Sequence, residues 1–145
     1  MLPLMGNPGY AADKPDFTGR WELVIEKSDF GNVAKPARMT IESSISGAAM
    51  HSVQTTYSDQ ENQSTEFTWY LDGKKHGTDK PAPGYSVTRW EDSTLVTERK
   101  SNDGAYRQVI QMTLSRDGKT ATEVIQTTNP SGKNKEKLVW RRVDK

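Results

Sequence analysis

The side chains most often used for catalysis and metal binding are scarce in this sequence. His51 and His76 are the only histidines, and there is no cysteine. A histidine can transfer protons near neutral pH, and His76 lies in a turn-rich stretch where it could act as an acid or base. Zinc needs several converging ligands, and no cluster of His, Asp and Glu has that spacing. We expect both histidines to be solvated, and we predict no metal and no cofactor.

The sequence also gives little support for a catalytic nucleophile or a catalytic pair of carboxylates. A Ser/His/Asp triad can assemble from distant positions, so the sequence does not exclude a hydrolase. However, the chain has no Gly-x-Ser-x-Gly motif. Several acidic residues fall mostly opposite the apolar rows, and we expect them on an outer face, paired with Lys and Arg. They are Glu22, Glu42, Glu66, Glu98 and Glu123.

The aromatic and basic residues of the central segments favour a binding pocket instead. Aromatic side chains with polar tips are typical of small-molecule sites. The candidate ligand-binding residues are Tyr57, Phe67, Trp69, Tyr85 and Tyr106, with Arg107 or Arg141 as polar anchors. An inward arginine would orient an anionic or carbonyl-bearing ligand, although outward and solvated is the default for Arg89, Arg99 and Arg107. The same rings would also suit a filled core, and both alternatives remain open.

Short strands must position these residues, because apolar and polar side chains alternate along most of the chain. In the strand expected at 19–27, Trp21, Leu23 and Ile25 share one face. Turn residues separate further expected strands at 37–46, 49–58, 64–71, 85–91, 94–100, 105–115, 120–128 and 135–143, with a possible short strand at 74–79. Consecutive hairpins of this kind predict an all-β fold, a single antiparallel up-and-down β-barrel of eight to ten strands. A two-sheet sandwich is the alternative.

Composition is consistent with one domain of this kind. The chain has 145 residues, of which 32% are hydrophobic, and that fraction suits strands that each expose one face to water. The net charge of +1, with acids interleaved among the bases, predicts no nucleic-acid partner. No apolar run approaches the roughly 20 residues that would span a membrane as a helix.

The amino-terminal residues differ in character from the rest. Residues 1–5 are apolar, and Gly9 and Ala11 place small residues where a signal peptidase would cleave. We interpret 1–13 as a disordered leader or the remnant of a signal peptide, and 14–145 as the barrel domain. A mature protein beginning near Ala12 or Asp13 would be periplasmic or secreted.

Both ends of the barrel domain resemble known proteins. Residues 17–21 (FTGRW) are similar to the Gly-x-Trp start of the first strand in calycins, the group of lipocalins and fatty-acid-binding proteins. Residues 139–145 are similar to the arginine-bearing last strand of that group. The resemblance implies a lipocalin-like barrel in which a first-strand tryptophan closes one end beneath a last-strand arginine. Trp21 with Arg141 or Arg142 would form that cation–π contact.

One further resemblance is more specific, and two features of fatty-acid-binding proteins are not matched. The pattern DFTGRW at 16–21 followed by KSDFG at 27–31 resembles a group of small exported bacterial proteins. This resemblance implies no particular activity. Fatty-acid-binding proteins carry a two-helix lid after the first strand, whereas only residues 28–36 separate the first two expected strands here, so we expect no helical lid. Their carboxylate clamp of two arginines and a tyrosine would align with Arg141, Gln111 and Val143, so a clamp of that kind is not expected.

These observations lead to one preferred function. We expect non-covalent binding of a small hydrophobic or amphipathic molecule inside the barrel of an exported bacterial protein. One alternative is an enzyme, a hydrolase or isomerase, that acts in the same cavity with His51 or His76 as its acid–base group. Another is a structural envelope module with a filled core. The sequence leaves the oligomeric state open.

Overall fold

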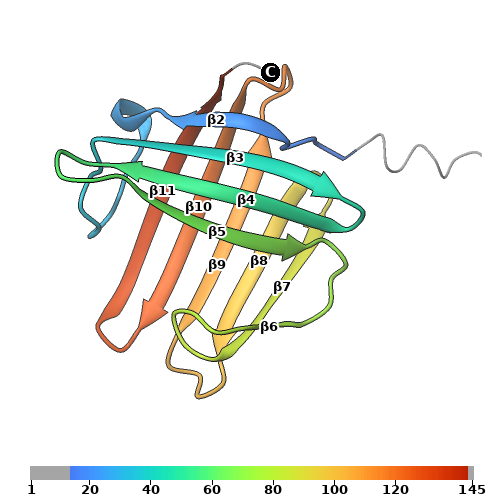
Figure 1. Ribbon diagram of the computed structural model, residues 1–145. Helices are drawn as coiled ribbons and strands as arrows, with labels where there is room; N and C mark the ends of the chain where they lie inside the picture. The colour runs from blue at the N-terminus through green and yellow to red at the C-terminus, as the bar shows by residue number, and fades with distance from the viewer. Residues whose placement is uncertain (1–13, 144–145) are drawn as a thin grey trace, which may run out of the picture.

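Ten strands and one short 3₁₀ helix make up the computed structural model, which describes residues 14–143 (Figure 1). The expected leader, residues 1–13, lies outside the described residues. The strands are β2 (Gly19–Leu23), β3 (Arg38–Ser46), β4 (Ala49–Tyr57), β5 (Gln63–Tyr70), β6 (His76–Thr78), β7 (Gly84–Glu91), β8 (Thr94–Ser101), β9 (Arg107–Leu114), β10 (Thr120–Asn129) and β11 (Gly132–Arg142). The helix is η1 (Ile25–Lys27). The all-β prediction is confirmed.

Antiparallel pairing runs through all ten strands in the order β5-β4-β3-β2-β11-β10-β9-β8-β7-β6. The first strand therefore pairs with the last, with Leu23 opposite Trp140 and Trp21 opposite Arg142. In Figure 1 the layer formed by β2 to β5 crosses the strands from β7 to β11 at a steep angle. Side chains from the two layers enclose the interior, and the predicted up-and-down barrel is confirmed in a nearly closed form.

Closure is incomplete at one place. β5 and β6 are the two edge strands of the sheet, and they are not hydrogen-bonded to each other, although β5 packs near β7. Tyr70 on β5 stacks on His76 of β6, with ring centroids 4.1 Å apart, and so connects the two edges through side chains.

The first strand is shorter than its alternating pattern predicted. It ends at Leu23, and residues 25–27 turn into η1 instead of continuing to position 27. The chain nevertheless stays beside β11, because Asp29 forms an isolated antiparallel bridge with Lys137. Among the described residues no α-helix lies between β2 and β3, as expected for a barrel without a helical lid.

One end of the barrel is closed by the residues that precede and begin β2. Phe17 is 2% exposed and stacks on Trp90, with ring centroids 6.2 Å apart. The indole nitrogen of Trp21 donates a hydrogen bond to the carbonyl of Phe17 at 2.9 Å. Together with Trp140, which is 1% exposed, these rings belong to the buried hydrophobic core.

Arg142 fastens this closed end. Its guanidinium carbon lies 4.3 Å from the centre of the Trp21 ring. Its nitrogens donate to the backbone carbonyls of Gly118 at 2.8 Å, Asp16 at 2.9 Å and Thr18. The expected cation–π contact between Trp21 and a terminal arginine is confirmed, and Arg142 is the residue that makes it.

Replacement of Arg142 tests the strength of this closure. We expect Arg142→Met to lower the free energy of unfolding by about 2–3 kcal/mol, because three carbonyls lose a charged donor and Trp21 loses its cation. Urea unfolding followed by tryptophan fluorescence measures the change. Arg141→Met is the matched control: Arg141 is 60% exposed with Glu22 at 3.6 Å, so its removal should cost less than about 0.5 kcal/mol. Equal losses in the two variants would contradict the role of Arg142.

Candidate functional site

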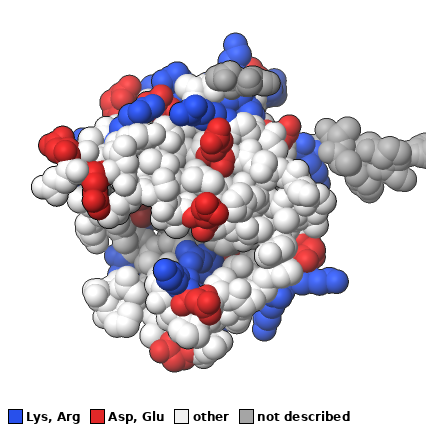
Figure 2. Space-filling view, in the orientation of Figure 1, with Lys and Arg blue, Asp and Glu red and all other residues white. Residues whose placement is uncertain are grey.

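The barrel interior contains a cavity of about 310 Å³. That volume lies at the lower end of the range found for small-molecule sites. The lining is mostly apolar, and several of its side chains, among them Phe67, Trp69 and Met112, are only partly buried because one side faces the cavity. Figure 2 shows a hollow in the surface, with acidic and basic side chains at its rim. The presence of this cavity favours the prediction of an open interior and disfavours the alternative of a filled core.

Strand alternation determines which side chains reach the cavity. β4 contributes Met50, Ser52 and Gln54, and β5 contributes Thr65, Phe67 and Trp69. On the opposite layer the lining residues are Arg99 of β8, Gln108, Ile110 and Met112 of β9, Ala121, Glu123 and Ile125 of β10, and Trp140 of β11. In each strand the contributors are alternate residues, as the pleat requires.

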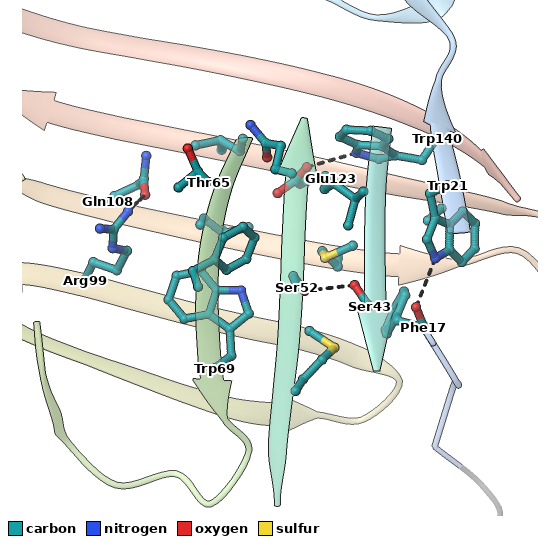
Figure 3. Close-up of a pocket in the computed structure, with 18 residues that line it drawn as sticks. Phe17, Trp21, Ser43, Ser52, Thr65, Trp69, Arg99, Gln108, Glu123 and Trp140 are labelled. Atoms are coloured by element: carbon teal, nitrogen blue, oxygen red, sulfur yellow. Dashed lines mark hydrogen bonds between the residues drawn. The ribbon is translucent and has the colours of Figure 1, made fainter. Parts of the chain in front are cut away.

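Arg99 is the basic residue of this lining. It donates to the side-chain oxygen of Gln108 at 3.0 Å and to the backbone carbonyl of Lys80 at 2.7 Å. Gln108 in turn donates to the hydroxyl of Thr127 at 3.1 Å, so a polar row crosses β8, β9 and β10. Figure 3 shows Arg99 and Gln108 together at the end of the cavity remote from Trp21.

Among residues 14–143, no acidic side chain forms an ion pair with Arg99. Within the described part of the chain its hydrogen-bond acceptors are neutral, and its buried Nε has no partner. Its guanidinium also faces the rings of Trp69 and Tyr106, at 5.7 and 5.9 Å from their centres. Arg89 and Arg107, by contrast, both approach Glu98. A partly buried cation with only neutral partners is suited to an anionic group supplied from outside.

Glu123 is the acidic residue of the lining. Its Oε1 accepts a hydrogen bond from the indole nitrogen of Trp140 at 2.9 Å, shown as a dashed line in Figure 3. Burial raises the pKa of Glu123 to about 7, against the lowering effect of the Trp140 hydrogen bond, and Glu136 adds a small further increase. The prediction of an outer-face carboxylate was wrong for Glu123, which points inward between Ala121 and Ile125.

Solved structures share this architecture. Fatty-acid-binding protein 1 of Echinococcus granulosus is 16% identical, with a TM-score of 0.64 over 88% of this chain and 98% of that one. The fluorescent protein UnaG is 16% identical, with a TM-score of 0.61 over 88% and 97%. Zebrafish ileal bile acid-binding protein, solved with cholic acid, is 16% identical, with a TM-score of 0.55 over 88% and 98%.

The fold is that of a calycin-like β-barrel. At such low identities the likeness shows the fold alone. No protein-family model and no curated protein matches the sequence. The resemblance to calycins is therefore confirmed at the level of the fold, whereas the narrower resemblance to exported bacterial proteins stays a prediction.

The calycin-like barrel brings two of the predicted ligand-binding residues into the cavity. Phe67 and Trp69 line it from β5, with ring centroids 5.1 Å apart. Tyr106 lies beside the site, where its ring faces Arg99. Burial raises the pKa of the Tyr106 hydroxyl, and the nearby Arg99 charge partly opposes that increase.

The other predicted ligand-binding residues are absent from the lining. Tyr57 lies under the guanidinium of Arg38, and Tyr85 under the ammonium of Lys75, each 4.5 Å from the ring centre. Arg107 and Arg141 are each 60% exposed and approach carboxylates outside the cavity. The reason is alternation: each of these four residues has the opposite parity to the inward residues of its strand.

Neither histidine lies in the cavity lining. His51 is about half exposed and contacts Thr68 and Glu66. His76 pairs with Asp72 at 3.0 Å, where hydrogen bonds from the Lys74 backbone and from His76 lower the pKa of the Asp72 carboxyl. Among residues 14–143, no group of three His, Asp or Glu side chains could hold a metal ion, and no helix there is long and apolar enough to cross a membrane.

The burial of Glu123 predicts a dependence of stability on pH. Its pKa is raised from 4.5 to about 7, so between these values the folded protein holds a proton that the unfolded chain has lost. The contribution of Glu123 to the free energy of unfolding should therefore be complete below pH 4.5 and fall as the pH rises to about 7, by up to about 3 kcal/mol. Urea unfolding between pH 5 and 8.5 measures the slope.

Two variants isolate the effect. Glu123→Gln should remove most of the decrease, whereas Glu66→Gln, at a carboxylate that is 70% exposed on the outer face, should leave it unchanged. The same slope in wild type and Glu123→Gln would mean that Glu123 is not the group responsible.

Proposed function

We propose that this barrel binds a small amphipathic molecule non-covalently, with the anionic group of the ligand at Arg99 and its apolar part against Phe67, Trp69 and Ile110. The observation that carries the proposal is the unneutralised Arg99 guanidinium at one end of a largely apolar cavity. An anion there would complete the hydrogen bonding of Arg99 and compensate its charge.

The remainder of the cavity favours an apolar chain or ring system. Ile41, Phe67, Trp69, Ile110, Met112 and Ile125 surround it. Water in contact with these side chains would be released when an apolar group replaced it, and that release favours binding. The fold similarity to a fatty-acid-binding protein and to a bile acid-binding protein is consistent with such a ligand.

We also propose export to the periplasm or beyond in a bacterial cell. This part rests on the composition of residues 1–13, which include an apolar run followed by small residues. Fractionation of bacterial cells that express the protein would test it, since a purely cytoplasmic product would contradict it.

A pair of arginine variants tests the ligand proposal. For wild type, decanoate should quench tryptophan fluorescence and show saturable binding by calorimetry, because Trp69 lies in the cavity wall. Arg99→Met should weaken decanoate binding about tenfold or more, as expected for the loss of a charge-assisted hydrogen bond, and should change the affinity for uncharged 1-decanol little.

Arg107→Met is the matched control. Arg107 lies on the neighbouring strand, is 60% exposed and faces away from the cavity, so its replacement should leave both affinities unchanged. Equal weakening of decanoate and decanol in Arg99→Met, or an equal loss in Arg107→Met, would show that Arg99 is not the anion site. The absence of binding by either compound to wild type would contradict the proposed function itself.

A further inference from the structure

A second polar group faces the cavity near its closed end. Glu123 accepts the Trp140 hydrogen bond through Oε1 alone, and none of the described residues donates to its Oε2. Figure 3 shows that this second oxygen is turned away from Trp140. Because Glu123 belongs to the cavity lining and retains partial exposure there, Oε2 is available to a bound molecule.

The strand register gives the offset along the barrel between the level of this group and the level of the arginine. Arg99 is opposite Gln108, and Gln108 is opposite Thr127, so the three residues lie at one level of the barrel. Glu123 precedes Thr127 by four residues on the same strand. At the usual rise of a strand the separation along the strand direction is about 13 Å, and Arg99 is further displaced by two strand spacings, about 10 Å across the sheet.

The wall between the two levels is apolar. Ile110 and Ile125 form one opposed pair, and Met112 is opposite Glu123. All three side chains line the cavity. A ligand that extends from Arg99 towards Trp140 therefore meets an anion site, then an apolar stretch, and finally a hydrogen-bond acceptor.

We infer that Glu123 and Trp140 form a second polar subsite, which binds a hydroxyl group of the ligand at a level about 13 Å along the strands from the level of its anionic group. This inference rests on the proposed function and specifies the ligand class: a hydroxylated amphipathic acid, whose hydroxyl donates to Glu123 Oε2. Three observations support the inference. Oε2 of Glu123 has no donor among the described residues, Trp140 orients the carboxyl group, and the residue spacing along β10 sets its offset from the level of Arg99.

A hydroxyl group fits this position better than an ammonium group. The charged groups that face Glu123 are Glu136 on β11, which raises its pKa, and Arg99 at the far level. A hydroxyl can donate to the carboxyl group in either protonation state, whereas an ammonium needs the ionised state and loses more hydration on burial. The raised pKa of Glu123 supports the neutral partner.

Fatty acids that differ only at the end of the carbon chain opposite the carboxylate test the subsite. Decanoate, 10-hydroxydecanoate and 10-methoxydecanoate would be titrated into wild type at pH 8, where Glu123 is mostly ionised and can only accept. We expect the hydroxy acid to bind about tenfold more tightly than the methoxy acid, which has no donor. The eight- and fourteen-carbon hydroxy acids, which place the hydroxyl at other depths, should lose this advantage.

Variants at Glu123 locate the effect. In Glu123→Leu the hydroxy acid should lose its advantage over the methoxy acid, because its hydroxyl would be buried without an acceptor. Glu123→Gln keeps an acceptor for Trp140 but turns an amide NH2 towards the ligand, from which the hydroxyl and the methoxy oxygen can both accept, so the preference should be lost here as well while the Trp140 contact is retained. The ratio between two ligands measured on the same variant is insensitive to a uniform loss of folded protein, and circular dichroism would confirm that each variant is folded.

The outcomes separate this inference from the proposed function. If decanoate binds in an Arg99-dependent way but the hydroxyl gives no advantage, or gives the same advantage in Glu123→Leu, the second subsite is refuted and the anion site stands. If none of the acids binds wild type, both proposals fail.

Discussion

Pairing of the first strand with the last is the constraint on which the rest of the structure depends. Only the register of Trp21 opposite Arg142 and Leu23 opposite Trp140 brings the tryptophans and the arginine to one end. Arg142 then binds three carbonyls from the segment before β2 and from the turn between β9 and β10. Without this closure the interior would open to solvent along β2 and β11, and neither Arg99 nor Glu123 would lie in a shielded environment.

The shielded interior makes two ordinary side chains chemically unusual. Arg99 keeps its charge among neutral acceptors and aromatic faces, whereas Glu123 has a pKa near neutrality because its ionised form is poorly solvated. The two groups lie at different levels of an otherwise mostly apolar wall. Their separation gives the cavity a direction, so that a ligand with one charged end would bind in a single orientation.

The sequence predicted the fold well and the site only in part. Trp21, Leu23, Phe67 and Trp69 lie in clear alternating rows, so the strands and part of the interior could be inferred. Arg99 was expected to point outward by default, because Leu95, Val96 and Thr97 of its strand are all buried and alternation there does not identify the inner face.

Glu123 was missed for a similar reason. Its strand, β10, is rich in threonine, and the adjacent Val124 and Ile125 are compatible with either face. Tyr57 was placed inside because it shares parity with Val53, whereas the inward residues of β4 are Met50, Ser52 and Gln54. Only the strand register, which depends on pairing between distant segments, resolves such cases.

The missing ladder between β5 and β6 has a consequence for the passage of molecules. β5 carries Phe67 and Trp69 and is hydrogen-bonded along one edge only, to β4. Displacing its free edge from β7 would separate side chains such as Tyr70 and His76 and would strain the backbone hydrogen bond from Gly73, just after β5, to Thr88 of β7, but it would leave the β4–β5 ladder intact. An opening between β5 and β7 would therefore give a ligand a path into the cavity without unfolding of the barrel.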